Sequence, residues 1–338
     1  MPRLRVANPR MSPFPIGLIG AGKHGQRYLN HVRADVPELR IAALSRRDTD
    51  RGGAQAREVG CTFHADWRDL VSDPAVAGVV AVVPPSLHPA IVDAVATAGK
   101  PLLIEKPLAT SGADAAAVVR RIRAAGLPCL MAHTLRWNTV VLALRERLAG
   151  LGPMRALVVN QRFEPSPLEW LDRPEASGGG IVLHTGVHSF DLVRALTGAE
   201  VARVWCRTAQ AVTRRTEDNF LATLELAGSD TLVAVGGSRA TAGRSGLVDI
   251  ACRDGQIVGD HQQHWLHTVV GLQRSPIDLG PAAPTVREAM RAFVGLALRG
   301  EEPPVAVEDG ARAVLIAEAC LRSAAAGGAA TAVAPLDV

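Results

Sequence analysis

The two halves of the chain differ in how apolar and polar positions alternate. Between residues 16 and 131, short apolar runs are separated by longer segments with helical periodicity. The apolar runs that we predict as buried strands are residues 16–19, 39–44, 79–83, 102–104 and 130–131. The predicted helices between them begin near Gly25, Gly53, Pro89 and Ser111. Strands and helices that alternate in this way are typical of a doubly wound parallel sheet.

Beyond a predicted helix over residues 140–148 and a break at Gly150, Gly152 and Pro153, the segments become longer and richer in strand-forming residues. The strands predicted there are residues 156–163, 201–208, 220–226, 231–238 and 247–252. Helices are predicted over residues 181–196, 286–298 and 309–325. This order predicts an α+β domain on a mostly antiparallel, open-faced sheet.

Composition narrows the possible partners and compartments. The 37 Lys and Arg residues nearly balance the 33 Asp and Glu residues, and the net charge of +4 is not gathered into a basic block, which argues against nucleic acid as a partner. The five cysteines are widely spaced without a C-x-x-C pair, so a disulfide framework is not indicated and a reducing cytoplasm fits. The apolar runs are too short for a membrane span, and prolines interrupt the first fourteen residues, which lack the apolar core of a signal peptide.

A glycine-rich turn follows the first predicted strand. Gly20, Gly22 and Gly25 form a G-x-G-x-x-G pattern that includes Lys23 and His24, in the strand–turn–helix setting of dinucleotide-binding Rossmann domains. We expect Gly20 to allow the tight turn, Gly22 to let a pyrophosphate approach the backbone, and Gly25 to let the helix pack closely. The helix N-terminus would offer amides and a positive dipole to the phosphates. A glycine turn that binds nothing is the alternative.

Ser45, Arg46 and Arg47 stand about twenty positions further on, where the contact to the adenosine ribose is expected. An acidic residue there would bind the ribose hydroxyls of NAD, whereas a hydroxyl and two guanidinium groups suit the 2′-phosphate of NADP. The alternative is that both arginines are solvated and that Asp48 or the backbone contacts an NAD ribose. The sequence favours NADP over NAD.

Two further segments follow the ends of predicted strands, where ligands of doubly wound sheets bind. We place in the cofactor site Pro84, Pro85, His88, Glu105 and Lys106. A lysine flanked by a carboxylate and by Pro107, a candidate for a cis peptide bond, would have a lowered pKa and act on a substrate hydroxyl. A surface ion pair between Glu105 and Lys106 is the alternative.

Together these segments closely resemble the family of glucose-fructose oxidoreductase, inositol dehydrogenase and MocA (Gfo/Idh/MocA). The resemblance spans nearly the whole chain, through residues 20–25, 84–88, 98–101, 105–109, 135–137, 178–191 and 304–310. The Glu-Lys-Pro segment combined with the glycine run and the histidine helix that follows it is its specific part. The interrupting prolines and the change of pattern predict a flexible tail over residues 1–14 and two domains, a Rossmann domain over 15–135 and a second domain over 136–338, which the resemblance implies is used for substrate binding and oligomerisation. A homodimer or homotetramer is the assembly it implies.

The resemblance also implies hydride transfer between nicotinamide and a hydroxyl-bearing carbon of a sugar, cyclitol or related polyol. Lys106 and His188 would lie near the reacting oxygen. Because an imidazole titrates near neutral pH, His188 would accept the alcohol proton during oxidation and return it during reduction, while Lys106 positions and polarises the oxygen. The alternative for His188 is a helix histidine satisfied in the domain interface.

His184 departs from the family pattern, which commonly has an Asp four residues before the histidine. In one continuous helix, His184 and His188 lie a turn apart on one face, with Asp191 three residues further on. Two close imidazoles disfavour double protonation, so we expect the pair to titrate as a unit. A second proton relay, a changed substrate preference and lost catalysis all stay open for His184.

We expect no metal site. The two helix histidines have the spacing of a metal pair, but the Glu of the metalloprotease pattern is missing and the family is generally metal-free. His261, His264 and His267 lie in a stretch that we predict as irregular and interpret as solvated.

Trp137, Asn138 and Trp170 are candidates for substrate contact, since aromatic faces and amides suit the surfaces of sugars. Core packing is the alternative for them. Residues 165–170 are a candidate loop over the cleft.

Two other functions would fit the same motifs. One is a glycosidase that uses tightly held NAD for transient oxidation and elimination, and the other is a non-catalytic protein that senses a dinucleotide or a sugar. His184 in place of Asp keeps the sensor open, whereas Lys106 and His188 argue against it. The leading hypothesis is an NADP-preferring dehydrogenase or reductase acting on CH–OH groups.

Overall fold

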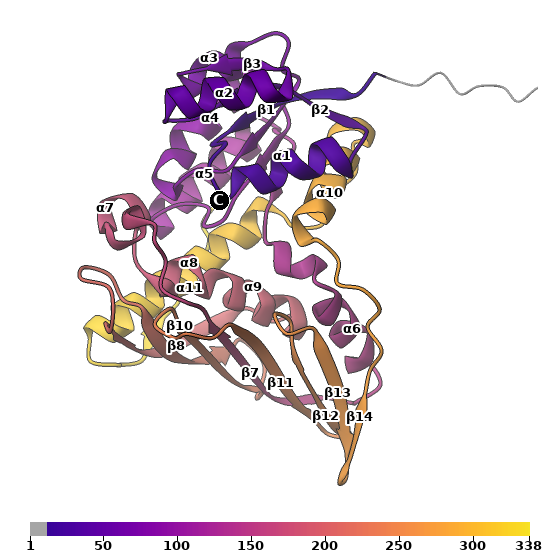
Figure 1. The fold of residues 1–338 in the computed structure, drawn as a ribbon. Helices are drawn as coiled ribbons and strands as arrows, with labels where there is room; N and C mark the ends of the chain where they lie inside the picture. The colour runs from indigo at the N-terminus through magenta and orange to yellow at the C-terminus, as the bar shows by residue number, and fades with distance from the viewer. Residues whose placement is uncertain (1–11) are drawn as a thin grey trace, which may run out of the picture.

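Two sheets, one in each half of the chain, organise the structure (Figure 1). The computed structural model describes residues 12–338. The strands of the first sheet are β1 Phe14–Ile19, β2 Leu39–Ser45, β3 Thr62–His64, β4 Gly78–Ala81, β5 Leu102–Ile104 and β6 Cys129–Met131. The helices between them are α1 Gly25–Ala34, α2 Thr49–Val59, α3 Trp67–Ser72, η1 Pro85–Leu87, α4 His88–Ala98 and α5 Gly112–Ala124.

These strands are parallel in the order β3-β2-β1-β4-β5-β6, so the chain reverses its direction of winding between β1 and β4. Ligands of such sheets bind at this switch point, beyond the carboxyl ends of the strands. The sequence did not predict β3 or α3, because β3 is three residues long and none of them is fully buried, which leaves no apolar run to detect.

The first strand begins earlier than expected. Phe14 belongs to β1, since its amide donates to the Glu38 carbonyl at 2.8 Å and its ring packs against the core. The predicted tail over residues 1–14 therefore extends one residue too far, and its first eleven residues lie outside the described residues.

The second sheet begins with β7, after η2 Thr134–Trp137 and α6 Thr139–Leu148. Its strands are β7 Met154–Arg162, β8 Val201–Ala209, β9 Asn219–Leu226, β10 Leu232–Ser238, β11 Ser245–Cys252, β12 Gly255–Asp260, β13 Trp265–Val270, β14 Gln273–Pro276 and β15 Thr331–Ala332. The remaining helices are η3 Glu169–Asp172, α7 Pro174–Ser177, α8 Ile181–His184, α9 Gly186–Thr197, α10 Thr285–Arg299 and α11 Val307–Ala325.

The second sheet runs β14-β13-β12-β11-β7-β10-β9-β8-β15, and the β7–β10 pair is parallel whereas the other pairs are antiparallel. The predicted fold class, a Rossmann sheet followed by an α+β domain on a mostly antiparallel sheet, is confirmed. Two predictions are corrected here. The single helix over residues 181–196 is interrupted at Thr185, and residues 265–270 form a strand rather than an irregular stretch.

Helices cover one face of the second sheet. Buried and exposed positions alternate along β9, with α9 and α11 packed on the buried side. Two C-terminal helices connect the two halves of the chain: α11 also packs against α5 and β6, and α10 packs against α1 (Figure 1).

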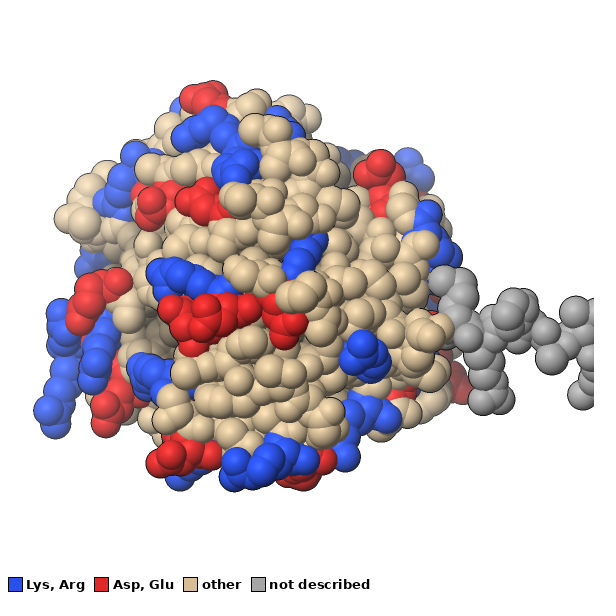
Figure 2. Space-filling model, turned by 90° about the horizontal axis from the view of Figure 1, so that it is seen from above, with Lys and Arg blue, Asp and Glu red and all other residues tan. Residues whose placement is uncertain are grey.

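The opposite face of this sheet exposes the apolar side chains of Leu221 and Leu232, which are 69% and 72% exposed. The expected oligomer stays a prediction. No helix within residues 12–338 combines the length and the apolarity needed to cross a membrane. On the face seen in Figure 2, basic and acidic side chains are interspersed.

Buried ion pairs join the end of the first sheet to the helices of the second half. Arg136 in η2 donates to both carboxylate oxygens of Asp191 in α9, at 2.9 and 2.6 Å, and lies 3.3 Å from a carboxylate oxygen of Asp309 in α11. Arg194 bonds Asp309 at 2.9 Å and Glu200 at 2.8 Å. Asp191 is only 1% exposed, so its charge depends on Arg136 for compensation.

We predict that Arg136→Ala lowers the free energy of unfolding by about 3–5 kcal/mol, because it leaves a buried carboxylate without its counter-charge. Urea denaturation measures the loss. The control is Arg253→Ala, which removes an exposed pair with Asp254 and should leave the unfolding midpoint nearly unchanged. Equal effects of the two substitutions would contradict the prediction.

Candidate active site

The glycine turn has the geometry that was expected of it. Gly20 has a φ of 92°, and the amides of Gly20 and Ala21 donate to the Ser45 carbonyl at 2.9 and 3.2 Å. A Cβ at Gly20 would collide with the Val82 carbonyl, and one at Gly25 would collide with the Gly20 carbonyl. A Cβ at Gly22, by contrast, would meet no atom within 4 Å, so the backbone there is open to a ligand.

The predicted ribose contacts lie beside this turn. Ser45 is buried at the end of β2, and Arg46 donates to the Ala21 carbonyl at 3.2 Å. Arg47 is exposed, as are Lys23 and His24 in the turn itself. Asp48, the alternative ribose contact, accepts from the Arg51 amide at 3.1 Å and caps α2. Arg46 therefore contacts the turn, whereas the Asp48 carboxylate is engaged in capping α2.

A buried carboxylate connects the glycine turn to the end of β5. Glu105 is 4% exposed and accepts from His24 Nε2 and from the Tyr28 hydroxyl, both at 2.6 Å, and from the Lys106 amide at 3.0 Å. Burial acts to raise the pKa of Glu105, but the charges of His24 and Lys106 and these hydrogen bonds outweigh it and lower the pKa to about 2. The alternative of a surface ion pair with Lys106 is thus wrong.

Lys106 reaches across to the second half of the chain. Its Nζ donates to the backbone carbonyl of His184 at 3.1 Å, and its bond to Pro107 is cis. Burial and the charge of Arg239 lower the pKa of Lys106, while Glu105 acts to raise it.

The loop after β4 supports this segment. Pro85 is buried, and His88 Nδ1 donates to the Leu108 carbonyl at 3.0 Å, so the predicted loop over residues 84–88 and the segment over 105–108 are in contact. Burial lowers the pKa of His88 to about 4, which keeps its ring neutral.

His188 is partly buried and lies near two further imidazoles, those of His133 and His261. Its ring meets that of His133 edge-on, with 5.9 Å between ring centroids. Within residues 12–338, His188 Nδ1 and both ring nitrogens of His133 and His261 have no hydrogen-bond partner. Burial and the charge of Lys106 hold the pKa of His188 well below its ordinary value, so its ring is neutral near pH 7.

Sequence reasoning missed His133 and misjudged His261. His133 follows the carboxyl end of β6, a position that sheet topology makes significant. His261 is 5% exposed rather than solvated, and its ring lies against Gly246, where a Cβ would collide with it. The two neighbouring histidines have other partners: His264 pairs with the Gly280 carbonyl at 2.9 Å and His267 with Arg274 at 3.1 Å.

His184 lies apart from the rings of His133 and His188. Its Nε2 donates to the Ser177 carbonyl at 3.1 Å, and Trp170 meets its ring edge-on at 5.2 Å between centroids. Because the helix is interrupted at Thr185, His184 and His188 do not belong to one continuous helix, and their rings contact different partners. Of residues 12–338, no three His, Cys, Asp or Glu side chains are grouped so that they could hold a metal ion.

The other proposed substrate contacts have structural partners. Asn138 caps α6 by accepting from the Val140 amide at 2.9 Å, and it donates to the His261 carbonyl at 3.3 Å. Trp137 is partly buried against the core. These contacts favour the packing alternative for both residues, whereas Trp170 lies beside a candidate site residue.

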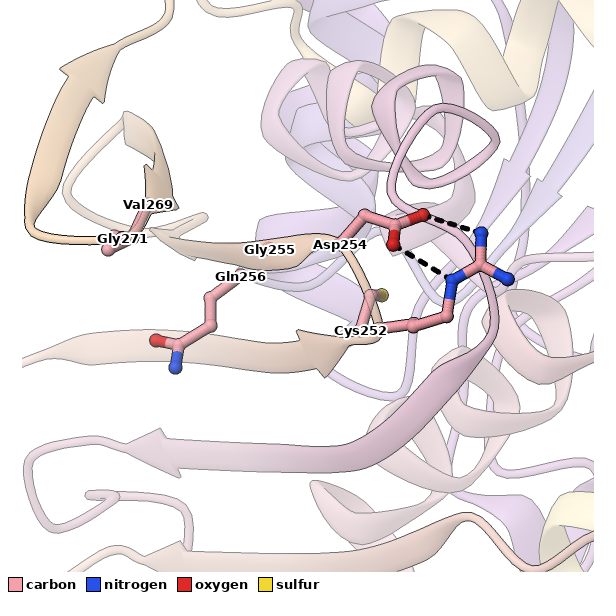
Figure 3. A pocket seen from close by; sticks show the side chains of 7 residues that line it. Cys252, Asp254, Gly255, Gln256, Val269 and Gly271 are labelled. Atoms are coloured by element: carbon pink, nitrogen blue, oxygen red, sulfur yellow. Dashed lines mark hydrogen bonds and ion pairs between the residues drawn. The ribbon is translucent and has the colours of Figure 1, made fainter.

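Two hollows differ in their chemistry. One of about 320 Å³ lies at the turns around residues 252–256 and 269–271, where Arg253 and Asp254 pair with each other at 2.8 Å (Figure 3). It contains none of the site residues above. The other, of about 220 Å³, lies under residues 165–172 and is lined by Gly180, Glu217 and Arg239, next to His184 and Lys106.

Comparison with known families gives a match for each half of the chain. The model described as "Oxidoreductase family, NAD-binding Rossmann fold" (GFO_IDH_MocA) matches residues 14–133, and the GFO/IDH/MocA C-terminal domain model matches residues 148–258. Inositol 2-dehydrogenase 1 of Saccharopolyspora erythraea is 29% identical over 350 aligned positions, covering 91% of this chain and 93% of that protein. Myo-inositol 2-dehydrogenase of Thermotoga maritima is 24% identical, with 91% and 95% covered.

Solved structures share the whole fold. Levoglucosan dehydrogenase in complex with NADH and levoglucosan has a TM-score of 0.84 at 21% identity, covering 96% of this chain and 100% of that one. Aldose-aldose oxidoreductase from Caulobacter crescentus, complexed with glycerol, also has a TM-score of 0.84, at 20% identity, with 95% and 99% covered.

Because several imidazoles are buried, we predict that the folded chain loses stability in acid. Burial lowers the pKa of His88 and His261 to about 4, against about 6.5 for an unfolded histidine. Between these values the unfolded chain binds more protons than the folded chain. The free energy of unfolding should therefore fall, as pH falls from about 6.5 to about 4, by up to about 1.4 kcal/mol per pH unit for each such histidine.

Urea denaturation at several pH values in this window measures the slope. The variant His261→Gln should reduce the slope by the contribution of one proton. A free energy of unfolding that does not change across the window would contradict the prediction.

Proposed function

We propose that this chain, which belongs to the Gfo/Idh/MocA family of oxidoreductases, transfers a hydride between a nicotinamide cofactor and a CH–OH carbon of a sugar, cyclitol or related polyol. The observation that carries the proposal is that two residues that follow the carboxyl ends of strands in the sheet with the open glycine turn reach the segment around His188: Lys106 bonds the His184 carbonyl at 3.1 Å, and the His133 ring meets the His188 ring. The relatives named as inositol 2-dehydrogenases support the substrate class.

The residues at the switch point fit a dinucleotide. The open backbone at Gly22 and the N-terminus of α1 would hold the pyrophosphate, and Pro84, Pro85 and Glu105 border the position expected for the nicotinamide half. When bound, the nicotinamide ring supplies or accepts the hydride.

Side chains of the protein accept and return the proton of the substrate hydroxyl. In oxidation the substrate loses a hydride from carbon and a proton from oxygen, and the neutral imidazole of His188 accepts that proton. The Lys106 ammonium, held by the His184 carbonyl, donates a hydrogen bond to the same oxygen and stabilises its developing negative charge. In reduction the proton returns from His188.

His184 acts here as a positioning residue. Its carbonyl holds Lys106, and its ring is fixed between Ser177 and Trp170. Burial lowers the pKa of His184 well below the ordinary value, so the ring adds no positive charge near pH 7. Of the three consequences considered for His184, these contacts support a changed substrate preference.

We predict that Lys106→Met suppresses turnover by about 10²-fold or more, because the reacting oxygen loses its cation, while cofactor affinity changes little. Nicotinamide absorbance measures turnover, and nicotinamide fluorescence measures binding. A net change in absorbance with substrate also separates a dehydrogenase from a glycosidase that retains its NAD. Full turnover of the variant would remove Lys106 from the mechanism.

For the cofactor we propose a preference for NADP, supported by Arg46 beside the turn and the exposed Arg47. NADPH should bind more tightly than NADH. The double variant Arg46→Ala/Arg47→Ala should lose at least about tenfold in NADPH affinity, since a charge-assisted hydrogen bond contributes about 1.5–3 kcal/mol, and should lose little for NADH. Arg51→Ala, at an exposed arginine paired with Asp48, is the control. Tighter binding of NADH by the natural chain would contradict the preference.

A further inference from the structure

Arg239 is a half-buried cation without an acidic partner. It directly follows β10, and its Nη2 donates to the Thr185 hydroxyl at 2.9 Å. Within residues 12–338 that is its one side-chain hydrogen bond, and no carboxylate lies within 4.0 Å of it. Burial lowers the pKa of Arg239 while the more distant Glu217 acts to raise it. A guanidinium held out of water without an anion is costly for the fold.

A second cation lies next to Arg239. Lys106 bonds the carbonyl of His184, and Arg239 bonds the side chain of the following residue, Thr185. The charge of Arg239 contributes to the lowered pKa of Lys106, which indicates that the two groups are close enough to repel each other. The fold therefore holds two like charges together beside the candidate active site.

The acids of this region are engaged elsewhere. Glu105 accepts from His24 and Tyr28, and Glu217 accepts from the amides of Gly180 and Val182 at 2.9 and 3.0 Å. Of the three other acids that line the hollow, Asp172 accepts from the amides of residues 214–216 and Asp218 from those of residues 211–213, and the exposed Glu169 pairs with Arg173 at 3.4 Å. At position 184 the chain has a neutral imidazole. Among the described residues, neither Lys106 nor Arg239 therefore has a carboxylate within ion-pair distance, although the charges of Glu105 and Glu217 act on their pKa values.

Space for a charged group exists next to Arg239. The hollow of about 220 Å³ under residues 165–172 is lined by Arg239, Gly180 and Ile181. Trp170 of that loop contacts His184, and α7 just after it packs against η1 of the first sheet. Arg239 thus lines this hollow and bonds Thr185, next to the His184 carbonyl that holds Lys106.

We propose that the natural substrate carries an anionic group, a carboxylate or a phosphate, that Arg239 binds beside Lys106. This inference rests on the proposed function and narrows its substrate to an acidic or phosphorylated polyhydroxy compound. Either group presents two or more acceptor oxygens to the planar fork of a guanidinium. The bound anion neutralises the pair of cations, and the hydride still leaves a neighbouring CH–OH carbon while His188 takes the hydroxyl proton.

The test compares matched substrates. Steady-state oxidation by the full chain, with NADP and with NAD, is measured on glucose and myo-inositol as neutral probes, on glucuronate and gluconate as carboxylates, and on glucose 6-phosphate. We expect kcat/KM to be at least tenfold higher for the carboxylates or for the phosphate than for the neutral probes. The better of the two anionic arms identifies the group, and a preference for the neutral probes overturns the inference.

Variants of Arg239 then separate specificity from structure. Arg239→Gln should raise KM for the favoured anionic probe about tenfold or more and leave KM for neutral probes unchanged, and Arg239→Lys should restore part of the loss. Arg244→Gln, at an exposed arginine that pairs with Glu164 at 2.8 Å, is the matched control. An equal change in KM for neutral and anionic probes overturns the inference.

A binding measurement keeps the inference testable apart from turnover. The anionic probe that is recognised should raise the thermal unfolding midpoint of the cofactor-free chain, and Arg239→Gln should abolish that rise. Turnover of neutral probes alone, with no anion-dependent rise, overturns the inference and leaves the proposed function standing. A rise that depends on Arg239 but comes without nicotinamide turnover on any probe supports anion binding and contradicts the proposed function. The absence of both overturns both.

Discussion

The bidentate ion pair between Arg136 and Asp191 is the interaction on which the geometry of the candidate site depends. Arg136 lies three residues after His133, at the end of the first sheet, and Asp191 lies three residues after His188 on α9. Joining the two charged side chains therefore also brings the two imidazoles into contact. Asp309 on α11 lies against the same guanidinium, so the C-terminal helix is fixed to the same point. Since Asp191 is buried, no water is available to replace the pair, and its geometry is strongly constrained.

Glu105 makes a second set of contacts that fixes the site, between α1 and the segment after β5. Its carboxylate fixes α1 through His24 and Tyr28, and it accepts the amide of Lys106. The helix that would face a pyrophosphate and the lysine that would face a substrate oxygen are thus set relative to each other by one buried anion. Lys106 then reaches the His184 carbonyl in the second half of the chain. A shift of the Arg136–Asp191 pair or of Glu105 would change the distance between the glycine turn and the imidazoles, so the geometry of the candidate site depends on both sheets.

The sequence predicted those features that are determined by residues close to one another in the chain. Buried parallel strands appear as apolar runs and the glycine turn as a strand–turn–helix pattern, because residues close in sequence determine them. The importance of Lys106 and His188 came from resemblance to a family. By contrast, β3 pairs through its backbone with little burial of its side chains, so no apolar pattern marks it. The burial of His261 depends on its contact with Gly246 on the neighbouring strand, and the break at Thr185 depends on tertiary contacts. Among the described residues, Arg239 has no carboxylate within ion-pair distance, and this cannot be read from the order of residues at all.

The two cations beside the site also bear on how it would discriminate between substrates. A site that closes over unpaired charges binds a neutral ligand poorly, because closing removes water from charges that the ligand does not compensate. A ligand with the matching anion removes that cost and gains charge-assisted hydrogen bonds, so the same two side chains favour one class and disfavour the other. An aspartate at position 184 would supply a carboxylate near Lys106 and weaken this contrast, whereas the neutral imidazole of His184 preserves it. His184 in place of an aspartate and Arg239 without an ion-pair partner thus have the same electrostatic effect. Both leave the site with positive charge that an anionic group of the substrate would neutralise.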